Sequence, residues 1–337
     1  MEYALLLDAA KESLKRLPSG KHVCSILEKS VFTPVQDILS RPCKEVRARL
    51  THLGFLLAHE EENEPTLEQQ KALTACGELI ELLHAGSLVV DDIQDNSEVR
   101  RGGPALHLRY GLPLALNVGN WMYFYAFEPL KQLHLPSEQM LAVYQATQET
   151  LLSAHYGQAL DLSTRIDELN PEQISEVSYA SLELKTGALM ALAIELGAII
   201  GGASADRRKT LNEFGLKLGI SLQMFDDIGN LKPEKPTAKH LEDLTNRRPS
   251  FVWAFLAQKE NQTLLPEFKE AIRHLPDITK LKYFIHSNNL TQKMWDQSWQ
   301  NFLQIQNELK TAIGHAEKFP NSFNHVYKLG ERIAHAY

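Results

Sequence analysis

The sequence predicts an all-α protein, in which one large single-domain helical bundle surrounds a central cavity. Apolar residues recur at intervals of three and four positions through most of the 337 residues, which is the spacing of amphipathic helices. Alternating β-branched runs, which indicate strands, are scarce. Several predicted helices exceed about 25 residues without a heptad seam or a membrane profile, and such helices most simply form the walls of a bundle.

Five long helices are predicted in the first two thirds of the chain, each from its start and stop signals. In chain order they cover about residues 66–99, 113–134, 136–162, 170–201 and 205–230. A charged loop over 232–236 separates them from shorter C-terminal helices. No composition shift or internal repeat marks a boundary. We therefore expect one domain over 1–337, with the functional motifs over about 42–251 and the C-terminal helices over 252–337.

Composition and charge exclude several classes of protein. Hydrophobic residues make up 44% and charged residues 23% of the chain, which excludes a disordered protein. The 35 Lys and Arg against 42 Asp and Glu give a net charge of −7, which argues against nucleic-acid partners. Three cysteines without C-x-x-C spacing fit a reducing compartment, so we expect a cytoplasmic protein. No targeting signal and no transmembrane segment is expected.

The first acidic cluster consists of Asp91, Asp92 and Asp95, directly after the uncharged stretch 82–90. At about 100° per residue, Asp91 and Asp95 lie about 40° apart around a helix, with Asp92 in the same sector. Like charges this close raise each other's pKa unless a cation neutralises them. Mg²⁺ prefers such oxygen ligands and keeps water and substrate phosphates in its remaining positions. A solvated helix end gives the same pattern, so this cluster alone leaves both interpretations open.

The second cluster consists of Gln223, Asp226, Asp227 and Asn230 and again follows an apolar helix. Offsets of three, four and seven residues place all four side chains on one stripe about 100° wide. Two such clusters, each at the end of a buried helix, predict opposing walls of one metal site.

Basic and polar side chains elsewhere in the chain supply the parts of an anion site. Arg100 follows the first cluster by just over one turn, and Lys185 lies in an otherwise apolar helix, where a charge needs a partner. A buried lysine is more often structural than catalytic, so each residue alone is weak evidence. Together with the acids and the apolar helices, they predict a pocket for a metal-bound diphosphate with an apolar tail. The full set is Arg100, Arg101, Gln158, Asp161, Lys185, Thr186, Lys239 and Arg248.

Six sequence blocks occur in a fixed order between about residues 42 and 251. They are L-L-H-A-G-S-L-V-V-D-D-I-Q-D over 82–95, R-R-G over 100–102, G-Q-A-L-D-L over 157–162, L-K-T-G over 184–187, L-Q-M-F-D-D-I-G-N over 222–230 and the segment 238–248. In this order and spacing they resemble the trans-prenyl diphosphate synthases, or polyprenyl synthetases, such as the farnesyl and geranylgeranyl diphosphate synthases. The resemblance implies the isoprenoid-synthase fold.

The resemblance also implies a role for each candidate residue. A cluster of about three Mg²⁺ ions would be bound directly by Asp91, Asp95 and Asp226, with Asp92, Asp227 and Asn230 in support. The allylic diphosphate would be held by Arg100, Lys185 and Lys239, and isopentenyl diphosphate by Lys44, Arg47, His84 and Arg101. Gln158, Thr186, Gln223 and Arg248 complete the substrate-binding set. The residues expected to be catalytic are Asp91, Asp92, Asp95, Lys185 and Asp226.

The implied activity is head-to-tail condensation of isopentenyl diphosphate with an allylic prenyl diphosphate. Mg-assisted loss of diphosphate gives an allylic carbocation, which the double bond of the acceptor attacks before a proton is lost. Gly86 and Ser87 are small residues just before Asp91, which predicts a deep channel and a product near C20, geranylgeranyl diphosphate, with C15 as the alternative. Residues 121–124 would close the channel floor. The resemblance further implies a homodimer.

Four positions depart from the family pattern. Glu45 is an acid where the family has a basic residue, Asn230 and Asn120 stand where Asp is common, and Ala238 replaces a glycine. They leave two alternatives open.

One alternative is a terpene cyclase or lyase, which ionises a prenyl diphosphate without an acceptor. The other is a non-catalytic partner subunit of a prenyl synthase. Lys44, Arg47 and His84 argue against the cyclase, because a cyclase has no use for an isopentenyl site. The intact acids of the first cluster argue against the partner subunit.

Overall fold

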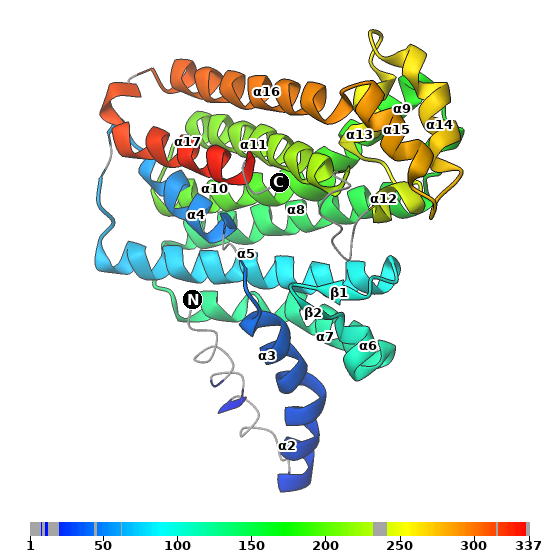
Figure 1. Ribbon diagram of the computed structural model, residues 1–337. Coiled ribbons are helices and arrows are strands. Elements are labelled where there is room, and N and C mark those ends of the chain that lie inside the picture. Colours follow the sequence, from blue (N-terminus) through cyan, green and yellow to red (C-terminus); the bar gives the residue numbers. More distant parts are fainter. Residues whose placement is uncertain are drawn as a thin grey trace. The chain divides into compact units, whose positions relative to one another are not determined.

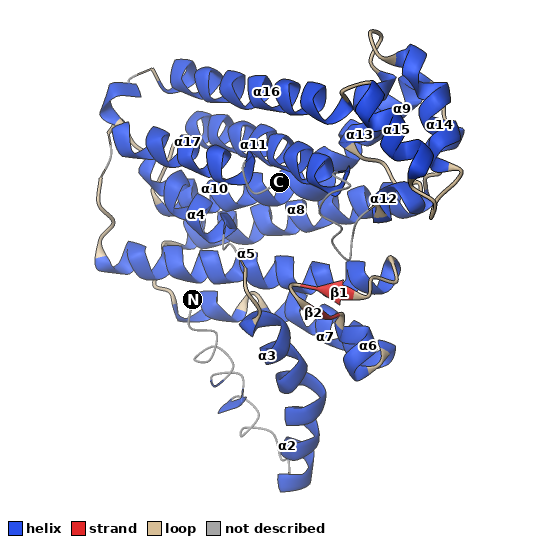
Figure 2. Ribbon diagram, viewed as in Figure 1, coloured by secondary structure: helices blue, strands red, loops and turns tan. Residues whose placement is uncertain are grey.

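The computed structural model describes residues 8, 11–12, 20–43, 46–61, 63–231, 241–314 and 316–334. The described residues are helical apart from connecting loops and one two-stranded hairpin (Figures 1 and 2). The predicted all-α class is therefore confirmed.

The chain divides into two compact units. The first comprises residues 1–49 and 66–135, and the second comprises 50–65 and 136–337. Helix α4 (Val46–Leu56) begins in the first unit and continues in the second. The expectation of a single domain over 1–337 stays a prediction.

The first unit is built on helix α5 (Leu67–Gln94), which leads into the first acidic cluster. A capping box fixes its start: the Thr66 side chain accepts a hydrogen bond from the Gln69 N–H, and the Gln69 side chain accepts one from the Thr66 N–H. Helix α7 (Leu112–Tyr125) packs along it (Figure 1). A Cβ on Gly86 would lie 3.0 Å from the carbonyl oxygen of Gly119, so the two glycines allow this close approach.

The remaining elements of this unit are short. They are α2 (Lys21–Leu27), the π-helical turn η1 (Glu28–Phe32), α3 (Thr33–Ser40), strands β1 (Val99–Arg100) and β2 (Gly103–Pro104), α6 (Leu106–Tyr110) and the 3₁₀ turn η2 (Glu128–Gln132). Two predicted helices extended too far. The first ends at Gln94 rather than near Val99, because Asn96 takes a left-handed conformation and the chain then enters the hairpin. The second ends at Tyr125, and only η2 continues it.

The second unit is built around helices α8 (Ser137–Ser163), α10 (Ala188–Ile200) and α11 (Ala205–Leu231). The predicted bounds of α8 and α11 agree with the structure to within about two residues. The other elements are η3 (Ile166–Glu168), α9 (Pro171–Ser181), η4 (Leu182–Gly187), α12 (Glu242–Thr245), α13 (Phe251–Ala257), η5 (Gln262–Leu264), α14 (Leu265–Ile272), α15 (Thr279–Ser287), α16 (Leu290–Ile313), η6 (Ala316–Lys318) and α17 (Pro320–Ala334).

The predicted helix over 170–201 is continuous but not uniformly α-helical. Asn170 caps its start through a capping box with Gln173. Between α9 and α10, the six residues of η4 form a π-helical turn that carries Lys185 and Thr186. Such turns are rare overall but are often found at functional sites, and no sequence pattern predicted this one.

Helix α10 is buried along almost its whole length. The part of α4 that belongs to this unit lies directly against it. A Cβ on Gly54 would lie 1.9 Å from the Ile194 carbonyl oxygen, and one on Gly197 would lie 1.8 Å from the Thr51 carbonyl oxygen. The two backbones touch, so this helix pair depends on both glycines.

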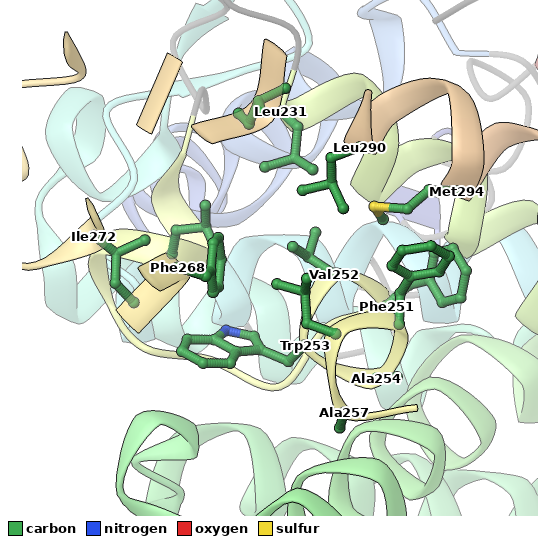
Figure 3. Packing of buried hydrophobic residues seen from close by; sticks show 14 of the residues in the cluster. Leu231, Phe251, Val252, Trp253, Ala254, Ala257, Phe268, Ile272, Leu290 and Met294 are labelled. Carbon is green, nitrogen blue, oxygen red and sulfur yellow. The ribbon is translucent and has the colours of Figure 1, made fainter. Parts of the chain in front are cut away.

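A cluster of buried hydrophobic residues, several of them aromatic, surrounds α13 in the second unit (Figure 3). The rings of Trp253 and Phe268 pack edge to face, with centroids 4.9 Å apart. Helix α16, to which Leu290 and Met294 of this cluster belong, has 24 residues. It is shorter than α5, α8 and α11, as expected of the C-terminal helices, although it is the longest helix described after residue 251. Its apolar residues are confined to one face, among them Leu290, Met294 and Phe302.

Among the described helices, α5 alone is long and apolar enough to cross a membrane by length and composition. In its most apolar window 67% of the residues are buried. A buried core helix meets the same criteria, so the finding is weak evidence for a membrane span.

Candidate functional site

Asp92 is the most enclosed acid of the first cluster, with 2% of its surface exposed. The Nε of Arg100 lies 2.9 Å from both of its carboxylate oxygens, and Arg100 Nη2 also contacts Asp92 Oδ1. Arg100 Nη2 lies 3.5 Å from Asp91 Oδ2. Asp91 and Asp95 keep part of their surface in solvent. Asp92 therefore holds Arg100 in place, whereas Asp91 and Asp95 are the better placed of the three to bind an ion.

Arg100 and Arg101 are carried by the β1–β2 hairpin, in which Arg100 pairs with Gly103. Arg101 (φ 48°) and Gly102 (φ 76°) form its two-residue turn, and both have the positive φ of a type I′ turn. This conformation is easy for glycine but costs an arginine about 1–2 kcal/mol, so the surrounding structure must hold the turn. The sequence predicted both arginines but not the hairpin that presents them.

His84 lies on α5 among arginines of the same unit. Burial lowers its pKa well below the usual value, and the charges of Arg47, Arg101 and Arg100 lower it further. The imidazole is therefore neutral at neutral pH. The predicted acceptor residues Arg47, His84 and Arg101 are thus brought together, whereas Lys44 lies outside the described residues.

Glu81 is an acid of this group that sequence reasoning missed. It is 3% exposed, and its side chain accepts a hydrogen bond from the Ala48 N–H at 3.3 Å. Burial lowers the pKa of Arg47, and the negative charge of Glu81 acts in the opposite direction. Glu81 therefore balances the charge of Arg47. Its position three residues before His84, on the same helical face, was the signal available in the sequence.

Lys185 pairs with an acid, as predicted for a charged residue in an apolar helix. Its Nζ lies 3.2 Å from Oδ2 of Asp161, a residue that is only 5% exposed. Arg248 Nη1 donates to the backbone oxygen of the same Asp161 at 2.7 Å. A Cβ on Gly157 would lie 2.7 Å from the backbone nitrogen of Lys185, so α8 touches the π-helical turn directly. Three predicted blocks of the second unit therefore meet at Asp161.

Gln223 connects this turn to the second acidic cluster. Thr186 Oγ1 donates to Gln223 Oε1 at 3.1 Å, and Gln223 Nε2 donates to Asp227 Oδ1 at 2.8 Å. The other oxygen of Asp227 accepts a hydrogen bond from the Phe251 N–H at 2.7 Å, at the start of α13. Asp227 therefore orders the protein around it, as Asp92 does in the first unit.

Burial raises the pKa of Asp227 well above its usual value, and the charges of Asp243 and Asp226 also raise it. Asp226 and Asn230 lie half-buried on the same helix, and Gln158 is half-buried on α8. Lys239 lies outside the described residues. Among the residues that the structure describes, no group of three or more Asp, Glu, His or Cys side chains is close enough together to hold a metal ion. The carboxylate oxygens of Asp91, Asp95 and Asp226 are nevertheless the hard ligands that suit Mg²⁺.

Comparison with known proteins agrees with these features. The family model for polyprenyl synthetase matches residues 28–286. A geranylgeranyl diphosphate synthase of Sulfolobus acidocaldarius is 35% identical over 171 residues, which are 50% of this chain and 50% of that protein. The chain thus spans about half the length of this relative. A terpene synthase of Matsumurasca onukii is 31% identical over 265 residues, or 77% of this chain and 80% of that protein.

The fold is also shared with solved structures. One is a geranylgeranyl pyrophosphate synthase from Corynebacterium glutamicum, complexed with isoprenyl diphosphate and magnesium. It superposes with a TM-score of 0.77 at 21% identity, over 98% of this chain and 95% of that one. The isoprenoid-synthase fold expected from the sequence is therefore confirmed. The match to the family model extends over most of the chain, and the chain belongs to the polyprenyl synthetase family.

Proposed function

We propose that this chain is a trans-prenyltransferase, which joins isopentenyl diphosphate head-to-tail to an allylic prenyl diphosphate. The observation that carries the proposal is the placement of two anion-binding groups along α5. Asp91 with Arg100 stands at its C-terminal end, and His84 with Arg47 and Arg101 lies two turns earlier. Seven residues at ~1.5 Å each separate the groups by about 10 Å, which is suitable for two diphosphates bound side by side.

The allylic diphosphate is the leaving group in this proposal. Asp91, Asp95 and Asp226 would hold Mg²⁺, which when bound supplies positive charge to the departing diphosphate. Arg100 would bind the same diphosphate while Asp92 keeps its guanidinium oriented. Lys185 is another basic residue expected to bind this diphosphate, and Asp161 fixes its position. The remaining members of the set are Gln158, Thr186, Gln223, Lys239 and Arg248, with Asp227 and Asn230 in support.

The acceptor, isopentenyl diphosphate, would bind at His84. A neutral imidazole can donate one hydrogen bond to a phosphate oxygen, while Arg47 and Arg101 supply the charge. The allylic C–O bond breaks, and the acceptor double bond forms the new C–C bond with the allylic carbon. The proton released from the acceptor goes to the departed diphosphate, so no side-chain base is needed.

Two observations support a product near C20. The Sulfolobus acidocaldarius relative is a geranylgeranyl diphosphate synthase, whose name gives a C20 product. Ser87, one turn before Asp91, is small and half-buried, and its hydroxyl donates a hydrogen bond to the His84 carbonyl oxygen at 2.9 Å. The small Ser87 side chain leaves room at this level for a long prenyl tail, whereas Gly86 is small because α7 packs against it.

The terpene synthase of Matsumurasca onukii gives a reason to test a second function, ionisation of a prenyl diphosphate without an acceptor. Arg47 and His84 favour the transferase, since they have no use without isopentenyl diphosphate. Incubating the protein with Mg²⁺, isopentenyl diphosphate and each of the C5, C10 and C15 allylic diphosphates tests the proposal. Elongated linear diphosphates ending near C20 are expected. Cyclic hydrocarbons without elongation would overturn the proposal in favour of the terpene synthase, and chains that end at C15 would overturn the predicted length.

The proposal extends to three properties expected from the sequence. They are a cluster of about three Mg²⁺ ions, a homodimer and a cytoplasmic location. The free thiols of Cys24, Cys43 and Cys76 support a reducing compartment. Equilibrium dialysis with Mg²⁺ and inorganic pyrophosphate measures the ion count, and sedimentation measures the oligomeric state.

A further inference from the structure

We propose that Arg41 is a positioning residue for the hairpin that binds diphosphate, a role that rests on the proposed function of that hairpin. Arg41 stands at the end of α3 and is 9% exposed. Its Nη1 donates a hydrogen bond to the carbonyl oxygen of Arg100 at 2.7 Å. Arg100 in turn binds Asp92 through its side chain. One arginine therefore holds the backbone from which the second arginine acts.

Arg41 is itself fixed by Asp37, one turn earlier on α3. Its Nε donates to Asp37 Oδ1 at 3.1 Å, and the two side chains are 8% and 12% exposed. Burial alone would raise the pKa of Asp37, but the hydrogen bond and charge of Arg41, together with the Tyr110 hydrogen bond and the charge of Arg109, outweigh burial and lower it. Asp37 is therefore ionised at neutral pH and anchors Arg41.

Asp37 also holds the chain on the other side of the hairpin. Its Oδ2 accepts hydrogen bonds from Arg109 Nη1 at 2.9 Å and from the Tyr110 hydroxyl at 3.1 Å. Both residues lie at the end of α6, which follows the hairpin directly. The pair Asp37 and Arg41 thus attaches both sides of the segment 99–110 to α3.

Gly103 provides the room for Arg41. A Cβ at this position would lie 3.1 Å from Arg41 Cζ and 3.2 Å from Arg41 Nη1. Unlike Gly102, Gly103 does not have a positive φ, so its backbone alone does not require glycine. The absence of a side chain at 103 is therefore explained by the guanidinium packed against it.

The hairpin needs such a support because of Arg101. Its left-handed conformation is unfavourable for a residue with a side chain, and the Arg41 hydrogen bond fixes the carbonyl group that enters the turn. Without that bond the turn would relax, and Arg100 and Arg101 would lose their orientation toward the diphosphates. The effect should be larger on KM, which reflects substrate binding, than on kcat, the turnover rate of the bound complex.

The test compares Arg41→Met with Arg109→Met. Each variant removes one guanidinium from Asp37, but of the two only Arg41 donates to the hairpin backbone. In Arg109→Met the Tyr110 hydroxyl still attaches α6 to Asp37, so this variant is the matched control. We expect Arg41→Met to raise KM for the allylic diphosphate about tenfold and to leave kcat within about threefold. The Kd of inorganic pyrophosphate in the presence of Mg²⁺, measured by calorimetry, should rise by a similar factor. Arg109→Met should change neither KM nor Kd by more than about twofold.

Gly103→Ala gives a second test through non-additivity. Alone, Gly103→Ala should raise the Kd of pyrophosphate, because its Cβ displaces Arg41. In the Arg41→Met background, the same substitution should raise the Kd little further. Equal effects of Arg41→Met and Arg109→Met on Kd, or additive effects of Gly103→Ala and Arg41→Met, would overturn the role of Arg41. Failure of the wild-type protein to condense its substrates would refute the proposed function instead, while the Kd values would still decide the role of Arg41.

Discussion

Arg100 and Asp92 form a pair in which one guanidinium nitrogen, Nε, lies 2.9 Å from both carboxylate oxygens. The side chains are only 13% and 2% exposed, so the two charges depend on each other. Removing one partner of such a pair leaves an uncompensated charge in a poorly solvated place.

The first prediction concerns this pair. Arg100→Met should destabilise the protein by about 3 kcal/mol, because the buried Asp92 carboxylate loses its ion pair with Arg100. The double variant Asp92→Asn with Arg100→Met should recover most of that stability, since no charge is then buried. It should not recover activity, because the diphosphate has lost Arg100. Urea unfolding and a prenyl transfer assay measure the two effects, and a double variant as unstable as the single one would contradict the interpretation.

The second prediction concerns Lys185. Lys185→Met should lower kcat by about 10²-fold, the usual effect of removing one group that stabilises charge in the transition state. Lys217→Met is the matched control, because Lys217 pairs with Glu308 on an exposed surface of the same unit, with 51% and 44% of the side chains exposed. The control should keep wild-type kinetics. A loss of activity confined to KM would mean that Lys185 acts in binding alone.

The third prediction concerns pH and His84. Its pKa in the folded protein is well below the usual 6.5, so the unfolded chain binds more protons between these two values. Stability should therefore fall as the pH falls below about 6.5. His84→Gln does not titrate and should lose less stability between pH 7 and pH 5.5. Urea midpoints at the two pH values measure the difference, and identical pH dependence in both proteins would show that His84 is not the titrating group.

The long helices were predictable because their ends carry local signals. Thr66 with Gln69 and Asn170 with Gln173 form capping boxes between neighbouring residues, which a sequence displays directly. The grouping of Asp161 with Lys185 was only partly predictable. A lysine within an apolar helix was expected to have a partner. Which residue it would be could not be predicted, because residues 24 positions apart meet only through tertiary packing.

Other features had no local signal. The π-helical turn at Lys185 lies against α8 at Gly157, and helical periodicity does not distinguish it from an α-helix. The hairpin over 99–104 places an arginine at positive φ, which sequence patterns disfavour. Arg41 shows the same limit, since its partners include a backbone carbonyl 59 residues away.

The fourth prediction concerns product length. Ser87→Phe should shorten the main product from C20 to C15 or C10, because the ring would fill the tail channel one turn before Asp91. Thr74→Phe adds the same ring to an exposed position of α5 and should leave the product unchanged. Chromatography of the dephosphorylated products measures their lengths. A C20 product from Ser87→Phe would place the tail elsewhere.

The central claim is that loss of diphosphate is coupled to attack by isopentenyl diphosphate. The most direct test gives the wild-type protein Mg²⁺ and farnesyl diphosphate and measures diphosphate release with and without isotopically labelled isopentenyl diphosphate. We expect that release requires the acceptor and that one isopentenyl unit is incorporated for each diphosphate released. Release at the same rate without the acceptor, with no labelled product when the acceptor is present, would contradict it.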